Sequence, residues 1–188
     1  MGRHPLPGID ITRLNSFRRV GESIPRVVQP FCEDALIIDK DNGAGDTVEL
    51  SKELITICQA KIVVATCSTA GGLFRLSLPT VHFSHVLVDE AGYASEPETW
   101  IPLCVAGLGS KIVLAGDPKQ LGPVLSSKFS EEQGLGRSMI ERLMATSKPY
   151  QRDDANFQNQ GGYNPNYVTK LTENYRVVLQ TCSENRQK

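Results

Sequence analysis

The hydrophobic residues in the middle of the chain fall into three short runs, each followed by small or polar residues. The runs are Ile62–Thr66, Val86–Asp89 and Ile112–Ala115. Apolar runs without polar alternation are typical of strands that are buried on both faces of a parallel sheet. Successive runs start about 25 residues apart, which leaves room for the helical crossover that parallel strands require. The pattern therefore predicts an α/β fold, a parallel sheet with flanking helices.

Two later segments have the features of helices. Glu96–Leu108 tolerates Pro97 in its first turn, and its early glutamates are favoured near the positive end of the helix dipole. Gly134–Met144 places its hydrophobic residues on one face, namely Leu135, Met139, Ile140, Leu143 and Met144. We expect both segments to cover the sheet.

The remaining segments are richer in turn-forming residues. Tyr150–Asn166 contains many Asn, Gln and Gly residues and predicts a surface loop before a last strand at Val168–Leu171. Several prolines and the turn Asp41–Asp46 interrupt the first 50 residues. We expect this part to be a loop-rich approach with one short helix near Thr12–Val20.

Composition narrows the class of protein. The chain has 188 residues, 40% hydrophobic and 22% charged, which is typical of one globular domain. Its net charge of -1 weakens a nucleic-acid role without excluding it, because basic groups can be confined to a groove. Five cysteines without a C-x-x-C pair indicate neither a disulfide framework nor a zinc site. No apolar run approaches the ~20 residues of a membrane span, so we expect a soluble intracellular chain.

The run at Val86 delivers two adjacent carboxylates, Asp89 and Glu90. In an open α/β sheet, ligands bind beyond the carboxyl ends of the strands. An NTPase needs one carboxylate to hold hydrated Mg²⁺ and a second to orient or deprotonate the attacking water. Asp89 suits the first role and Glu90 the second. An acidic pair that starts a loop and caps a helix is the competing interpretation.

The run at Ile112 is followed by Gly116-Asp117-Pro118-Lys119-Gln120, on what should be the same sheet edge. Gln120 can orient a water molecule or bond a terminal phosphate oxygen, and Gly116 and Pro118 favour the turn that presents it. A turn without any ligand would also explain the glycine and the proline.

Hydroxyl-bearing residues close the first run, at Thr66, Ser68 and Thr69. Hydroxyls and free backbone amides donate to phosphate oxygens, which supply most protein–nucleic acid hydrogen bonds. These three residues are therefore candidates for RNA binding. Ser68 or Thr69 could equally cap the next helix, and both roles are compatible. Near the end of the chain, Leu171–Arg176 (LTENYR) ends in an arginine. Taken alone, this residue would be interpreted as an ordinary surface arginine.

Taken together, DEAGYASEPE at Asp89, LAGDPKQLGPV at Leu114 and LTENYR at Leu171 resemble motifs II, III and IV of superfamily-one helicases. This resemblance is narrowed by the segments VVATCSTAGGLF and HVLVDEAGYASEPE, by the stretch from GLGRSMIERLM through YQRD to NYR, and by RLNSF. They are similar to the Armitage branch of the up-frameshift-like RNA helicases, whose vertebrate members include the Moloney leukaemia virus resistance helicases. The resemblance covers residues 11–176.

The resemblance implies a RecA-like P-loop NTPase domain that uses ATP with Mg²⁺ as cofactor and unwinds RNA in the 5′-to-3′ direction. Asp89 would hold Mg²⁺ through water, Glu90 would be the catalytic base, and Gln120 would sense the γ-phosphate. Asp117 would join the nucleotide site and Arg176 would reach it as an arginine finger. Single-stranded RNA, ATP and small-RNA silencing proteins would be the partners, in the cytoplasm and away from membranes.

The sequence departs from the family at both ends. No G-x-x-x-x-G-K-[S/T] phosphate loop occurs in the 188 residues. We therefore expect an incomplete RecA-like domain without the phosphate-loop strand, in which a central strand position is uncovered. The expected division is an approach segment at 1–50, a core with motifs II, III and IV at 51–176, and a divergent tail at 177–188.

Two functions follow from these departures. The first is an internal segment of an ATP-dependent RNA helicase, which we expect to be inactive alone. The second is a catalytically inactive RNA- or protein-binding module derived from such a helicase. A nucleotide-binding assay on the chain distinguishes them.

Overall fold

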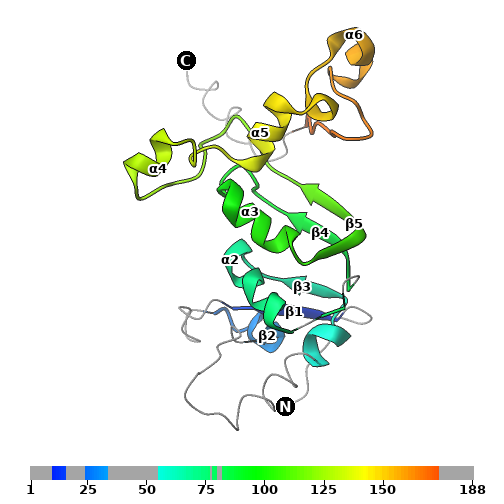
Figure 1. Cartoon of the computed structure of the whole chain (residues 1–188). Helices are drawn as coiled ribbons and strands as arrows, with labels where there is room; N and C mark the ends of the chain where they lie inside the picture. Colours follow the sequence, from blue (N-terminus) through cyan, green and yellow to red (C-terminus); the bar gives the residue numbers. More distant parts are fainter. Residues whose placement is uncertain (1–9, 16–23, 34–54, 77, 80–81, 174–188) are drawn as a thin grey trace, which may run out of the picture. The chain divides into compact units, whose positions relative to one another are not determined.

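A computed structural model describes residues 10–15, 24–33, 55–76, 78–79 and 82–173 of the chain. It divides the chain into two compact units, Met1–Glu141 and Arg142–Lys188. We call them unit 1 and unit 2 and treat each by itself. Figure 1 gives the elements of both units, coloured along the sequence.

Unit 1 contains two parallel sheets. In the first, β1 (Ile11–Leu14) lies between β2 (Cys32–Glu33) and β3 (Ile62–Val64). In the second, β4 (Phe83–Val88) pairs in parallel with β5 (Ala106–Leu114) (Figure 1). The predicted α/β class with parallel strands is confirmed. The expectation that all three hydrophobic runs share one sheet is wrong, because the first run pairs with β1 in the other sheet.

Unit 1 also contains short helical elements. They are η2 (Gln29–Phe31), a turn of helix at residues 55–59, α2 (Cys67–Ala70), η3 (Gly71–Leu76), α3 (Glu96–Leu103), α4 (Lys128–Glu132) and the start of α5 (Met139–Thr146).

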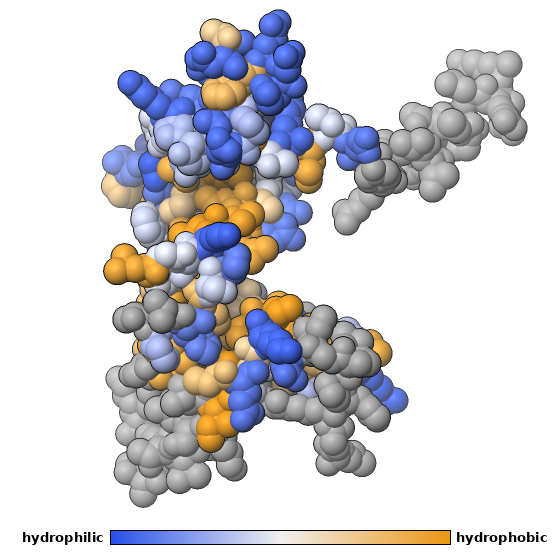
Figure 2. All heavy atoms as spheres, turned by 90° about the vertical axis from the view of Figure 1, so that its right-hand side faces the viewer, coloured by the Kyte–Doolittle hydropathy of each residue, from blue (hydrophilic) through white to orange (hydrophobic). Residues whose placement is uncertain are grey.

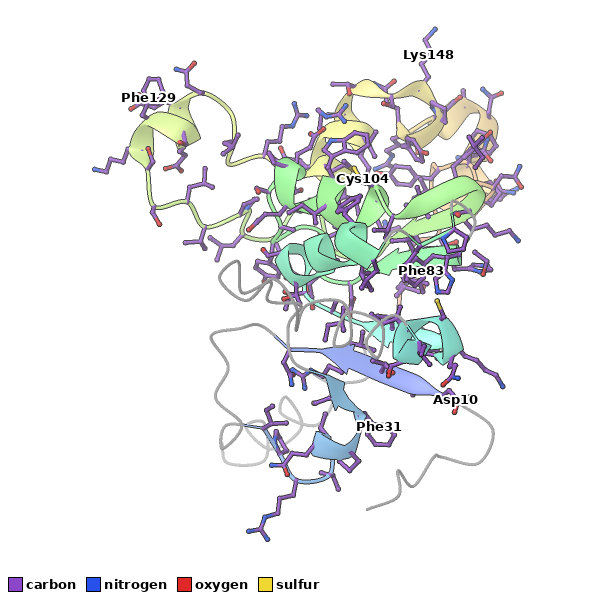
Figure 3. All side chains as sticks on the ribbon, turned by 60° about the horizontal axis from the view of Figure 1, so that its bottom comes forward. Asp10, Phe31, Phe83, Cys104, Phe129 and Lys148 are labelled. Atoms are coloured by element: carbon purple, nitrogen blue, oxygen red, sulfur yellow. The ribbon has the colours of Figure 1, made fainter. Side chains whose placement is uncertain are left out.

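Two hydrophobic clusters form the core of unit 1. The first gathers Leu14, Ile57, Ala70, Leu73 and Leu76, and the second gathers Val86, Val88 and Ala91. Phe83, at the start of β4, packs against both clusters (Figure 3). Helix α3 does so too, through Ile101 in the first cluster and Leu103 in the second. Phe83 and α3 therefore tie the two sheets of unit 1 together.

The first strand falls where the sequence predicted a helix. Along β1, Thr12 and Leu14 are buried to 3% exposure, while Ile11 and Arg13 are partly exposed. This alternation has the period of two that strands show. The predicted helix near Thr12–Val20 is therefore wrong in its first residues, and residues 16–20 lie outside the described part.

The boundary between α3 and β5 also differs from the prediction. Helix α3 ends at Leu103, one residue after Pro102, which lacks the N–H for a helical bond. The hydroxyl of Ser110 then accepts from the N–H of Gly107 at 2.9 Å and donates to the carbonyl of Phe83 at 2.6 Å. These bonds hold residues 106–108 beside β4 as strand, so β5 begins six residues before the predicted run at Ile112.

The second predicted helix begins later than expected. Gly134 has φ 89 and ends α4, because the N–H of Leu135 bonds the carbonyl of Ser130 at 3.0 Å. Such left-handed glycines are the usual stop signal of helices. Helix α5 therefore starts at Met139 rather than at Gly134. Helix α4, which carries Phe129 pointing away from its neighbours (Figure 3), was not predicted.

Unit 2 is held by short local bonds. It contains η4 (Lys148–Tyr150), α6 (Asp154–Phe157) and η5 (Gln158–Gln160), and Asp153 caps α6 by accepting from the N–H of Asn156. Arg152 donates to both carboxylate oxygens of Asp154 at 2.9 Å. The predicted last strand at Val168–Leu171 is absent from this described segment, and no residue of it has a strand partner there.

Hydrophobic side chains reach the surface beside the second sheet. Leu87 and Leu108 are 71% and 98% exposed, and Ile112 and Val113 are each about half exposed. Figure 2 shows hydrophobic atoms on this side, at the level of β4 and β5. Among the described residues, β5 has β4 as its one neighbouring strand. No helix in the described segments is long and apolar enough to cross a membrane.

Candidate functional site

The carboxyl end of β4 passes directly into an acidic turn. The N–H of Glu90 donates to Oδ1 of Asp89 at 3.0 Å, and the N–H of Tyr93 bonds the carbonyl of Glu90 at 2.9 Å. Glu90 has φ 52, which makes it the one non-glycine residue with positive φ among those described. Such left-handed conformations are rare for residues with a side chain and occur often at functional sites. Both carboxylates are exposed and therefore open to a ligand.

The turn after β4 interlocks with the turn after β5 through the backbone. The N–H of Ala115 bonds the carbonyl of Val88 at 2.8 Å, and the N–H of Ala91 bonds the carbonyl of Ala115 at 2.7 Å. Two glycines permit this approach. A Cβ on Gly92 would lie 2.7 Å from the carbonyl oxygen of Asp117, and one on Gly116 would lie 2.9 Å from the nitrogen of Ala91. The two turns therefore have no room to slide past each other.

Side chains join the same two turns. The hydroxyl of Tyr93 donates to Oε1 of Gln120 at 3.0 Å, across 27 residues of sequence. The amide nitrogen of Gln120 donates to Oδ2 of Asp117 at 3.3 Å. Oδ1 of Asp117 accepts from the N–H of Lys119 at 2.9 Å. Asp117 and Gln120 are thus placed on the same edge of the sheet as Asp89 and Glu90.

The end of β3 is organised differently. Thr66 caps α2, because its hydroxyl oxygen accepts from the N–H of Thr69 at 3.2 Å. The hydroxyls of Thr66 and Thr69 also lie 2.8 Å apart in a hydrogen bond. The capping role considered for Ser68 or Thr69 therefore belongs to Thr66. Ser68 is exposed.

Cys67 follows this cap and has a perturbed thiol. Burial raises the pKa of Cys67, and the negative charge of Glu98 raises it further. Glu98 is fixed at the start of α3, where its Oε2 accepts from both the N–H and the hydroxyl of Ser95. This arrangement is a capping box, and it places a carboxylate of α3 toward α2. Because the thiolate is the nucleophile, a raised pKa lowers the fraction of Cys67 that can react at a given pH.

Comparison with known proteins adds to this geometry. A family model described as an AAA domain matches residues 40–128. Mouse "RNA helicase Mov10l1" is 40% identical over 168 residues, which are 88% of this chain and 13% of the mouse protein. "Probable RNA helicase armi" of Drosophila melanogaster is 37% identical over 183 residues, 90% of this chain and 15% of the fly protein. Zebrafish "Putative helicase mov-10-B.1" is 52% identical over 120 residues, 62% of this chain and 11% of the fish protein.

The chain belongs to the Armitage and MOV-10 branch of helicases. The branch predicted from VVATCSTAGGLF, HVLVDEAGYASEPE and RLNSF is thereby confirmed. The chain spans between 11% and 15% of the length of these three relatives.

The structure brings some of the candidate residues of this helicase segment together and separates others. Asp89, Glu90, Asp117 and Gln120 lie on two interlocked turns at one sheet edge. The RNA candidates Thr66, Ser68 and Thr69 follow β3, in the other sheet of unit 1. Arg176 lies outside the described residues.

Sequence reasoning missed two features of this region. The capping box of Ser95 and Glu98 has a sequence signal, S-x-x-E before an apolar stretch, which could have located the start of α3 more firmly. Tyr93 has no such signal, because its hydrogen bond to Gln120 depends on the pairing of β4 with β5.

Proposed function

We propose that this chain is part of an ATP-driven RNA helicase motor, with a RecA-like nucleotide site at the carboxyl ends of β4 and β5. The observation that carries the proposal is the interlock of the two turns, which joins the Asp89–Glu90 pair to Gln120. Parallel α/β sheets bind ligands at this edge. The names of the mouse and fly relatives, both RNA helicases, support the same reaction class.

Within this site, each acidic residue has a distinct proposed role. Glu90 accepts the proton of the attacking water as catalytic base, and its exposed carboxylate is accessible to that water. Asp89 would hold the Mg²⁺ that accompanies ATP, through water. Gln120 contacts the γ-phosphate, Asp117 fixes Gln120, and Arg176 supplies the arginine finger when the motor closes.

The residues present fit a magnesium ion that is shared with ATP. The described part of the chain has no group of three or more His, Cys, Asp or Glu side chains that could hold a metal ion by themselves. Mg²⁺ in nucleotide sites is held by one or two carboxylates together with waters and phosphate oxygens. Asp89 can provide such a carboxylate. Bound there, the ion would neutralise charge on the β- and γ-phosphates.

The remaining parts of the proposal concern the nucleic acid and the cell. Thr66, Ser68 and Thr69 would contact backbone phosphates of single-stranded RNA, so binding would be indifferent to base sequence. Movement would run in the 5′-to-3′ direction along the RNA. Its setting would be small-RNA gene silencing in the cytoplasm, with silencing proteins as partners.

A chimeric helicase tests the proposed roles. In it, residues 11–176 of this chain replace the matching segment of mouse Mov10l1, and the steady-state rate of RNA-stimulated ATP hydrolysis is measured. Glu90→Gln should abolish turnover and leave ATP binding nearly intact, because the amide cannot accept a proton. Asp89→Asn should instead weaken Mg²⁺-dependent nucleotide binding. A folded chimera without turnover would overturn the proposed function, and equal loss of binding in both variants would overturn the division of roles.

The chain alone should behave differently from the chimera. The phosphate loop supplies most of the positioning and charge neutralisation in phosphoryl transfer, and no such motif occurs in the 188 residues. We therefore expect the isolated chain to show no ATP hydrolysis above its Glu90→Gln variant. If it instead retains RNA binding without nucleotide binding, the same surfaces act as an inactive binding module.

A further inference from the structure

We propose that Tyr93 is a positioning residue that fixes the orientation of the Gln120 amide, so that Gln120 presents an N–H donor to the terminal phosphate. This inference rests on the proposed nucleotide site and assigns to it a residue that the motif roles leave out. It also decides which of the two chemical tasks considered for Gln120 the site performs.

The orientation follows from what the two neighbours of Gln120 can donate or accept. The carboxylate of Asp117 accepts hydrogen bonds and donates none, so the amide nitrogen must face it, as the 3.3 Å contact shows. The amide oxygen then faces Tyr93, whose hydroxyl can donate to it at 3.0 Å. The opposite rotation of the amide would set two acceptors, the amide oxygen and the carboxylate, against each other. The pair of neighbours thus selects one rotation.

In this rotation the amide nitrogen keeps one hydrogen for a ligand. Its other hydrogen is directed to Asp117, and the amide oxygen already accepts from Tyr93. A donor complements the anionic oxygens of a phosphoryl group. Contact with the γ-phosphate is therefore favoured over orientation of the attacking water, in which the amide oxygen would accept a hydrogen bond from that water.

Tyr93 and Asp117, the two neighbours of Gln120, are each held by backbone hydrogen bonds, so the orientation of the Gln120 amide is set before a ligand binds. Asp117 is fixed by the N–H of Lys119 at 2.9 Å, and its carbonyl accepts from the N–H of Gln120 at 3.3 Å. Tyr93 is fixed on the other turn, where its N–H bonds the carbonyl of Glu90 at 2.9 Å. Tyr93 therefore connects the residue proposed as base with the residue proposed as phosphate sensor. The Tyr93 side chain is 47% exposed, so water competes for its hydroxyl and the effect of losing it is moderate.

The first experiment needs neither nucleotide nor turnover. The side-chain amide of Gln120 is observed by ¹⁵N relaxation in the full chain, with its resonance identified by its loss in Gln120→Ala. Tyr93→Phe removes the hydroxyl alone and should lower the order parameter of this amide. Tyr167→Phe, a matched change in unit 2, should leave it unchanged. Equal order parameters in the wild-type chain and Tyr93→Phe would overturn the proposal.

The second experiment uses the chimeric helicase. Tyr93→Phe should lower kcat for ATP about three- to tenfold, the effect of one neutral hydrogen bond, with KM for ATP changed less than about twofold. In a Gln120→Ala background the same substitution should have no further effect, because Tyr93 acts through Gln120. Independent, multiplying losses would overturn the positioning role. If the wild-type chimera hydrolyses ATP and Tyr93→Phe has the same kcat, only the role of Tyr93 is refuted. If a folded wild-type chimera shows no turnover, the proposed function itself is refuted.

Discussion

Two kinds of strand end occur in unit 1, and they differ in the reach of their hydrogen bonds. After β3, the polar side chains bond each other over three residues, from Thr66 to Thr69. After β4 and β5, two turns that are 27 residues apart are joined by backbone bonds, by glycine contacts and by Tyr93. The first end is complete within its own turn. The second exists only when the two strands pair.

This difference shows why one end is the stronger candidate for catalysis. Catalytic groups must be held in a fixed geometry before the substrate arrives, and bonds between separate segments provide this. A local cap needs no tertiary structure and is the usual way to begin any helix. The hydroxyls at Thr66 and Thr69 therefore have a structural role that would exist without RNA, and RNA contact would be additional.

The largest expected effect comes from breaking the interlock. Gly116→Ala should lower the free energy of unfolding of unit 1 by about 1–3 kcal/mol from the backbone conformation alone, since Gly116 has φ 154. Contact of the new Cβ with Ala91, 2.9 Å away, adds to the loss. Urea unfolding followed by the fluorescence of Trp100, the single tryptophan, measures it.

Two matched glycines separate the causes of this effect. Gly92→Ala keeps an ordinary φ and introduces only the contact with Asp117, whereas Gly109→Ala has φ 89 and meets no atom within 4 Å. Both should destabilise less than Gly116→Ala, and only Gly92→Ala should also release the Gln120 amide. If Gly109→Ala is as harmful as Gly116→Ala, steric interlock contributes nothing.

A smaller effect is expected at the local strand end. Thr66→Ala removes the cap of α2 and should cost about 0.5–1 kcal/mol, at the low end for such caps because Thr66 is exposed. Ser68→Ala, next but one along the chain, is the control and should be close to neutral. The Gln120 amide should be unaffected in both variants. A change at Gln120 in Thr66→Ala would mean that the two strand ends are coupled after all.

The smallest expected effect is on thiol reactivity beside the local cap. Burial and then the charge of Glu98 raise the pKa of Cys67, which lowers the fraction of its thiol that is ionised at pH 8. Cys67 is also partly buried, whereas Cys58 and Cys104 are exposed. Iodoacetamide should therefore modify Cys67 more slowly than Cys58 and Cys104. The difference in rate should narrow as the pH rises and more of the Cys67 thiol ionises. Mass spectrometry of the labelled peptides gives the three rates.

Glu98→Gln is the matched variant for this measurement. It removes the charge and keeps an oxygen that can accept from Ser95, so Cys67 should react slightly faster while α3 stays capped. Equal rates for Cys58, Cys67 and Cys104 in the wild-type chain would contradict the raised pKa of Cys67.

The parts of the fold that the sequence predicted are those governed by local pattern. The runs at Val86 and Ile112 became paired parallel strands, and the acidic pair and Gln120 came to one edge because parallel strands end together. The early part of β5 was misread because Ser110 captures it by bonds to Gly107 and Phe83, one of them 27 residues away. The link from Tyr93 to Gln120 was missed for the same reason. Sequence periodicity contains no information about such bonds between distant segments of the chain.

The left-handed backbone at Glu90 sets stability against chemistry at a single position. A residue with a side chain costs about 1–2 kcal/mol in this conformation, and glycine or asparagine costs less. Glu90→Gly and Glu90→Asn should therefore relieve the φ of 52 and at the same time remove the proposed base. A library of variants selected for thermal resistance alone would therefore drift toward proteins that lack the proposed base at position 90. A more thermostable form of this segment must therefore keep Glu90 in spite of its strained backbone conformation.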